Sequence, residues 1–110
     1  MTTYDHLPVY KASYDFLIKI FVTVKNFSKE YKYTIGEQLQ KEAVGLVSSI
    51  CTANRKLDKT EILILSKEKV ELLTLYLRIC SDMKLISLKK HVELTLILED
   101  ISKQLTDWSN

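Results

Sequence analysis

The sequence predicts an all-α protein, an antiparallel up-down-up-down four-helix bundle, on three observations. The chain of 110 residues has only 2 Gly and 1 Pro, too few for the many reversals of a strand-and-turn fold. Apolar side chains recur at intervals of three and four residues, which is the period of a helix face. Short connections separate four such segments, so consecutive helices should be antiparallel neighbours. The length suits a single domain over residues 1–110.

The first helix is expected over residues 7–29. Pro8 suits its first turn, where the missing N–H would have no helical partner. Ile18 and Val22 lie among lysines, outside the apolar arc. We expect the core face of this helix to consist of Tyr10, Tyr14, Leu17, Phe21 and Val24.

The second helix is expected over residues 34–56. Thr34 and Glu37 have the spacing of a capping box. The core face should hold Leu39, Ala43, Leu46, Ile50 and Ala53. Small residues gather on what we interpret as the outward side, where another helix could approach closely: Gly45, Ser48, Ser49 and Thr52.

The third helix, over residues 58–84, repeats this start pattern with Asp58 and Glu61. Its core stripe should be Ser66, Val70, Leu73, Leu77 and Cys80, widened by Ile62, Tyr76 and Met83.

The fourth helix, over residues 87–108, can be capped by Ser87. Its core ladder should be Leu94, Leu98, Ile101, Leu105 and Trp108.

Apolar residues outside these core faces favour self-association over an ordinary solvated surface. The fourth helix carries a second stripe of Leu88, Val92 and Leu96, and Ile64 and Leu75 stand on the polar side of the third. We expect the contact surface between subunits to include Ile18, Val22, Gly45, Ser49 and Thr52.

No constellation of residues indicates an enzyme, so we expect no catalytic site, metal, cofactor or small-molecule substrate. The histidines are His6 and His91, and neither follows a Glu by three residues as a di-metal bundle would require. Gly36 and Gly45 lie inside the second helix and cannot form a phosphate-binding loop. His91 is interpreted as a structural histidine.

The sequence predicts a cytoplasmic protein. The first residues have neither a basic start nor an apolar run, so we expect no signal peptide. The longest apolar run, residues 62–65, is far below the roughly 20 residues of a membrane span. Cys51 and Cys80 are expected to be buried, reduced thiols.

Positive charge is concentrated at two turns, although the net charge of +2 does not by itself indicate nucleic-acid binding. Arg55, Lys56 and Lys59 crowd the turn between the second and third helices. Lys84, Lys89 and Lys90 crowd the turn between the third and fourth. The two turns should lie at opposite ends of the bundle. Each could contact phosphates, or could simply keep its loop soluble.

The chain resembles the bacterial four-helix bundle proteins over about residues 5–108. This family includes the products of rRNA intervening sequences and Avd, the accessory variability protein of diversity-generating retroelements. The resemblance lies in the order and spacing of the segments DHLPVYKASY (5–14), YTIGEQL (33–39), ANRKLDK (53–59), VELL (70–73), LRI (77–79) and ISKQLTDW (101–108). RKLDK after Asn54 places the chain closer to the Avd branch.

The resemblance implies a homopentameric, non-enzymatic accessory protein that binds a reverse transcriptase and nucleic acid, chiefly template RNA, in support of mutagenic reverse transcription. Family-like cations occur at Arg55, Lys56, Lys59 and Arg78. Arg78 could bridge two phosphate oxygens or pair with Glu71 or Asp82. The alternative is a self-assembling structural or protein-interaction module without a nucleic-acid role, like the rRNA-associated relatives.

Overall fold

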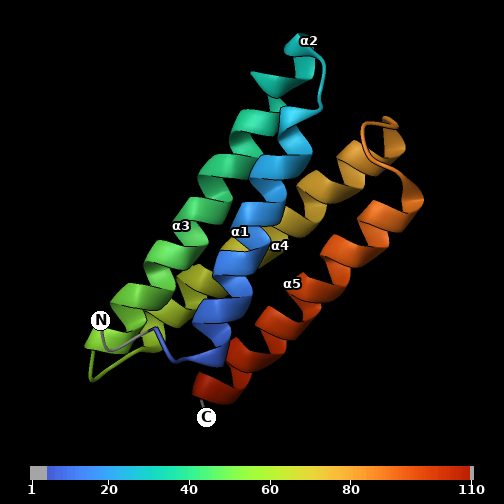
Figure 1. The fold of residues 1–110 in the computed structure, drawn as a ribbon. Helices are drawn as coiled ribbons and strands as arrows, with labels where there is room; N and C mark the ends of the chain where they lie inside the picture. The colour runs from blue at the N-terminus through green and yellow to red at the C-terminus, as the bar shows by residue number, and fades with distance from the viewer. Residues whose placement is uncertain (1–4, 110) are drawn as a thin grey trace.

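The computed structural model describes residues 5–109, and the regular elements of this part of the chain are all helices. The long helices are α1 (Pro8–Lys25), α3 (Ile35–Arg55), α4 (Thr60–Asp82) and α5 (Leu88–Ser109). A single helical turn, α2 (Lys29–Lys32), lies between α1 and α3. Consecutive long helices run in opposite directions (Figure 1). The predicted all-α, up-down-up-down four-helix bundle is therefore confirmed.

The bundle is elongated, with principal extents of 43 × 24 × 21 Å. α1 packs against α3 and α5, and α4 packs against the same two helices from the other side. α1 and α4 therefore lie on one diagonal of the bundle, and α3 and α5 lie on the other. This square arrangement places the core between all four helices.

The core stripes predicted for three of the long helices are confirmed. Every residue of the α3 and α4 stripes is buried, including Ser66 and Cys80. Four members of the α5 ladder are also buried, while Trp108 packs against the core from a half-buried position. Met83 is 49% exposed, so its predicted part in widening the α4 stripe is wrong.

The predicted core face of α1 is wrong in part. Val24 is buried as predicted, and Tyr10 and Leu17 pack against the core from half-buried positions. Tyr14 and Phe21, however, are 48% and 44% exposed. The buried face is Val9, Ser13, Phe16, Ile20 and Val24. The predicted face passed over Ser13 because it is polar, yet its hydroxyl donates to the Tyr10 carbonyl at 3.0 Å and enters the core satisfied. With apolar residues on both neighbouring arcs, periodicity alone could not choose between them.

The connection from α1 to α3 contains a turn that separates α1 from α2. α1 ends at Lys25, and the N–H of Phe27 bonds to the Val24 carbonyl at 2.9 Å. The Phe27 side chain is 7% exposed and packs into the core cluster. Burying this ring draws the chain inward, and the short helix α2 follows it.

The cap predictions had different outcomes. Thr34 occupies the N-cap of α3, but its hydroxyl donates to the Glu30 carbonyl at 2.9 Å, so the predicted capping box is wrong. The preceding α2 offers that carbonyl as a nearer partner. Asp58 accepts the Thr60 N–H at 3.0 Å from one residue before the N-cap of α4. Ser87 accepts the Lys90 N–H at 3.0 Å, as predicted.

The C-terminus of α4 closes through a left-handed residue that is not glycine. Lys84 has a φ of 61°, the region that L side chains rarely adopt. The Leu85 N–H bonds to the Cys80 carbonyl at 2.8 Å, and the Lys84 N–H bonds to the Ser81 carbonyl at 3.0 Å. This pair of bonds is a Schellman motif. It reverses the chain sharply and places the Lys84 side chain at the α4–α5 turn.

Candidate nucleic-acid interface

The antiparallel topology brings two connections to one end of the bundle. The segment between α1 and α3, which contains α2, lies at the same end as the turn between α4 and α5 (Figure 1). The opposite end holds the α3–α4 turn together with the start of α1 and the end of α5. Segments that are distant in the sequence therefore share each end.

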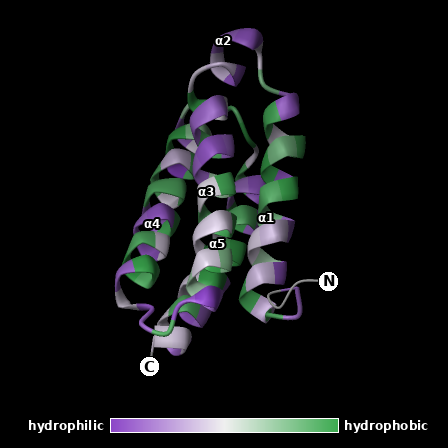
Figure 2. Ribbon diagram, turned by 90° about the vertical axis from the view of Figure 1, so that its left-hand side faces the viewer, coloured by the Kyte–Doolittle hydropathy of each residue, from purple (hydrophilic) through white to green (hydrophobic). Residues whose placement is uncertain are grey.

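Lysines from both connections gather at the first of these ends, which we call the lysine end. Its members are Lys25, Lys29, Lys32, Lys84, Lys89 and Lys90. Arg78 stands near it in the last part of α4. Cations outnumber the acidic residues of this end, which are Glu30, Glu37, Asp82 and Glu93. Figure 2 colours much of α2 as hydrophilic at this end of the bundle.

Only half of these lysines were predicted from the sequence as phosphate contacts. Lys84, Lys89 and Lys90 are close neighbours in the chain, which makes their cluster visible without a structure. Lys25, Lys29 and Lys32 were missed as binding candidates. The antiparallel topology could have located them, because it places the end of the first helix beside the end of the third.

Some charges at the lysine end are already paired. Lys90 Nζ lies 3.1 Å from Glu93 Oε1, and Lys19 Nζ lies 3.6 Å from Glu93 Oε2. The hydrogen bond from Lys90 is the main cause that holds the pKa of Glu93 below its ordinary value. Arg78 Nε lies 3.8 Å from Asp82 Oδ2, which selects Asp82 over Glu71 as its partner. Both side chains of that pair are largely exposed, so solvent competes for it.

The other lysines of this end present their charge more openly. Within residues 5–109, no carboxylate lies at ion-pair distance from Lys25, Lys29, Lys32, Lys84 or Lys89. Apart from half-buried Lys32 these residues are exposed. Their ammonium groups can therefore take up phosphate oxygens without first breaking an ion pair.

The second predicted cluster lies at the opposite end of the bundle, and two of its cations already contact other groups of the same chain. Lys59 Nζ stands 5.6 Å from the centre of the Trp108 ring and donates to the Lys56 carbonyl. The Arg55 guanidinium donates to Thr52 Oγ1 at 3.4 Å. Arg55, Lys56 and Lys59 thus do not join Lys84, Lys89, Lys90 and Arg78 in one site.

Some residues of the predicted subunit contact surface are exposed in the structure and others are buried within the subunit. Ile18 and Val22 are exposed on α1, at 46% and 59%. Ser49 was placed on an outward face, and this is wrong: it is buried, with its Oγ 2.6 Å from Ser66 Oγ of α4. Small residues on α3 therefore serve at least partly for contact with α4 of the same chain.

The neighbouring small residues of α3 border the same contact. A Cβ added at Gly45 would lie 3.0 Å from Lys69 Nζ, which itself lies 3.2 Å from Glu42 Oε1. Thr52 is half-buried. The predicted second stripe of α5 is exposed, with Leu88 at 74%, Val92 at 49% and Leu96 at 58%.

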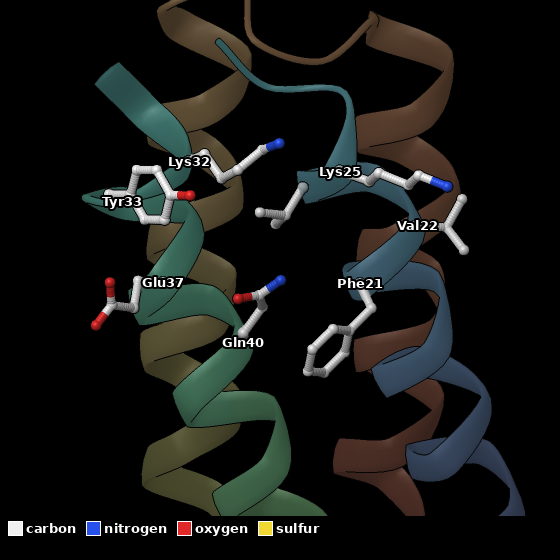
Figure 3. Close-up of a pocket in the computed structure, with 8 residues that line it drawn as sticks. Phe21, Val22, Lys25, Lys32, Tyr33, Glu37 and Gln40 are labelled. Atoms are coloured by element: carbon white, nitrogen blue, oxygen red, sulfur yellow. The ribbon is translucent and has the colours of Figure 1, made fainter. Parts of the chain in front are cut away.

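A groove opens between α1 and the start of α3, beside the lysine end (Figure 3). Its volume is about 580 Å³. Phe21 and Val22 of α1 line one wall, and Tyr33 and Gln40 line the other. Tyr33 is 63% exposed. No sequence pattern pointed to this groove, because its walls come from two helices and the turn between them.

Other chemistry at the surface is sparse. In residues 5–109 no group of three His, Cys, Asp or Glu side chains is placed to hold a metal ion. None of the helices described is long and apolar enough to cross a bilayer. Cys80 is buried, which raises the pKa of its thiol to about 11, while Cys51 is only half-buried. His91 is half-buried beside the α5 ladder.

Comparison with known families decides the relationship. A family model described as bAvd-like matches residues 8–110, nearly the whole chain. The chain belongs to the bAvd-like family. This match confirms the Avd-like resemblance that the order and spacing of the sequence segments indicated. No curated protein and no solved structure matched this bAvd-like chain.

In this bAvd-like protein, exposed lysines gather at one end of the bundle and an apolar groove lies beside them. The lysine end combines residues from the two connections, and Phe21 and Tyr33 line the adjoining groove. Apolar stripes remain exposed along α1 and α5. These three features are available on the described surface for contact with other molecules.

Proposed function

We propose that this bAvd-like protein is a non-enzymatic accessory protein of a diversity-generating retroelement, binding template RNA and a reverse transcriptase in support of mutagenic reverse transcription. The observation that carries the proposal is the meeting of lysines from two connections at one end of the bundle. Membership of the bAvd-like family, an accessory and non-catalytic type, supports it.

Surface lysines without an ion-pair partner support RNA binding at this end of the bundle. Exposed ammonium groups release condensed counterions when they neutralise phosphates, which supplies affinity without reading sequence. Lys84 and Lys89 carry exposed charge without an ion-pair partner in the described chain. The lysine end can thus bind a polyanion although the chain as a whole is only +2.

Self-association would strengthen this binding. The stripe of Leu88, Val92 and Leu96 on α5 and the exposed pair Ile18 and Val22 on α1 are apolar surfaces that a second subunit could cover. The family resemblance favours a homopentamer. A closed ring repeats the lysine end around its axis and turns a modest patch into a continuous positive field.

RNA binding is tested by titrating purified protein into a fluorescently labelled structured RNA, at about 50 and 200 mM salt. We expect affinity to fall steeply with salt. The double variant Lys84→Glu/Lys89→Glu should weaken binding at least about tenfold at the lower salt and flatten the salt dependence. Lys11→Glu/Lys103→Glu, at two exposed lysines of α1 and α5 away from the lysine end, makes the same change in net charge and is the matched control.

The same titration compares the two ends of the bundle. Arg55→Glu/Lys56→Glu removes the charges of the opposite turn. If this variant loses affinity while Lys84→Glu/Lys89→Glu keeps it, the lysine end is not the RNA site. Circular dichroism of every variant shows whether the bundle is intact.

The second candidate function is a self-assembling protein-interaction module without a nucleic-acid role. The exposed stripe on α5 favours it, because apolar contacts need no nucleic acid. Absence of RNA binding at about 50 mM salt, with an oligomer seen by sedimentation, would select this function over the first. A wild-type protein that is monomeric would remove the self-association common to both.

A further inference from the structure

The groove between α1 and α3 combines exposed aromatic rings with a neighbouring positive charge. The Phe21 ring projects from α1 toward α3, where the Gln40 amide lies, and the Tyr33 ring forms part of the opposite wall (Figure 3). Both rings are accessible, with Phe21 44% and Tyr33 63% exposed. Exposed aromatic rings beside a cationic surface are the usual means of holding single-stranded nucleic acid.

The charges around the groove favour an anionic occupant. The Lys32 ammonium extends across the upper end of the groove, whereas the Glu37 carboxylate points away from it (Figure 3). Lys25 belongs to the α1 side, but its ammonium points away from the α3 wall, so Lys32 is the cation that faces the groove (Figure 3). The groove is also continuous with the lysine end, because Lys25 and Lys32 belong to both.

We propose that this groove receives an unpaired base of single-stranded RNA, stacked on the Tyr33 ring, with the adjacent phosphate at Lys32. The Gln40 amide both donates and accepts hydrogen bonds, as the edge of a base does. A volume of about 580 Å³ is ample for a planar ring. The inference rests on the proposed RNA binding and names the kind of RNA that this surface selects.

Two other occupants fit less well. A second copy of the chain, placed with its own groove over this one, would bring the like charges of Lys25 and Lys32 together. An apolar peptide would use the rings but would leave the ammonium group of Lys32 without a counter-charge. A base attached to a phosphate satisfies both the rings and the charge.

The test compares two labelled oligonucleotides of equal length and charge, by fluorescence anisotropy at low salt. One is a single-stranded RNA and the other is the same sugar–phosphate backbone with abasic residues at every position. Wild-type protein should bind the base-containing strand at least about fivefold more tightly, which is the lower range for one stacked base. Tyr33→Leu should reduce that ratio toward one while keeping the affinity for the abasic strand.

The matched control is Tyr14→Leu. Tyr14 is also an exposed tyrosine, at 48%, but it stacks on Tyr10 and does not line the groove. Its replacement should leave the ratio unchanged. Because Tyr33 is largely exposed, Tyr33→Leu should fold normally, and circular dichroism verifies this.

Each other outcome overturns the proposal in a recognisable way. If wild type binds both strands equally, or if Tyr33→Leu keeps the preference for bases, the groove takes no base while RNA binding through the lysine end stands. If neither strand nor a structured RNA binds, the proposed function falls as well. If Tyr33→Leu converts an oligomer to monomer without changing the base preference, the groove is a subunit contact.

Discussion

The two glycines of α3 should respond oppositely to the same substitution. At Gly36 an added Cβ would lie 2.7 Å from Val24 Cγ1 and 3.0 Å from the Tyr31 carbonyl oxygen. Val24 is fully buried and the carbonyl belongs to the backbone, so neither can move aside easily. At Gly45 the added Cβ would meet only the end of the Lys69 side chain, at 3.0 Å from Nζ.

The magnitudes follow from these contacts. Overpacking costs about 1–3 kcal/mol, and Gly36 is only the second residue of α3, where little helix propensity is gained. Gly36→Ala should therefore lower the free energy of unfolding by about 1–2 kcal/mol. Gly45 is in the helix interior, where alanine gains about 0.8–1 kcal/mol. Displacing Lys69 from Glu42 offsets part of that gain.

Urea denaturation followed by far-UV circular dichroism measures both variants against wild type. Gly45→Ala should be equal to wild type or up to about 1 kcal/mol more stable. The two variants should differ by about 2 kcal/mol, which corresponds to roughly 10 °C in Tm for a domain of this size. A Gly36→Ala protein as stable as wild type would refute the argument, because the close approach of α1 to α3 would then have no energetic consequence.

Four further predictions concern stability and reactivity. Lys84→Gly should stabilise the fold by about 1 kcal/mol in thermal melts, because glycine relieves the left-handed backbone; an unchanged Tm would contradict this. The double variant Ser49→Ala/Ser66→Ala should lose less stability than the sum of the losses of the two single variants, since the two hydroxyls bond to each other. Additive free energies of unfolding in a double-mutant cycle would show that the two residues are not coupled. Cys80, with its pKa raised to about 11, should resist thiol reagents near pH 8 until the protein unfolds, and stability should fall as pH rises from about 9 toward 11; rapid labelling of the native state would be the opposing result. The lowered pKa of Glu93 contributes stability above the ordinary glutamate pKa of about 4.3 and loses it as pH falls further, so Glu93→Gln should flatten the acid limb of a stability–pH curve.

The fold was predictable where each helix has one apolar face. The α3 stripe could be read residue by residue, because its neighbours are mostly polar or small. The predicted α4 stripe is buried but omits Leu63, which is buried within a run of four apolar residues. α1 could not be read in this way, since Phe21 and Ile20 are adjacent and equally apolar, and only the positions of α3 and α5 decide which enters the core. The helical period fixes that a face exists but not which of two neighbouring arcs is covered.

The candidate site was less predictable than the fold, for a related reason. A cluster such as Lys89 and Lys90 is visible because its members are adjacent in the chain. Lys29 joins this cluster only because the α1–α3 connection and the α4–α5 turn lie at the same end of the bundle. Ser49 shows the converse error: a small polar residue suggested a free surface, but its hydroxyl had a partner on the next helix.

The position of the chain ends has a practical consequence for studying this protein. The start of α1 and the end of α5 lie at the end of the bundle opposite the lysine end, and the long axis measures 43 Å (Figure 1). A tag, surface linker or dye attached beside the start of α1 or the end of α5 is thus carried far from the lysines and from the groove. Immobilised through either end, the protein would present those surfaces outward to a soluble RNA. A dye there would also act as a distance reporter, since energy transfer to a labelled strand measures which end of the bundle the strand approaches.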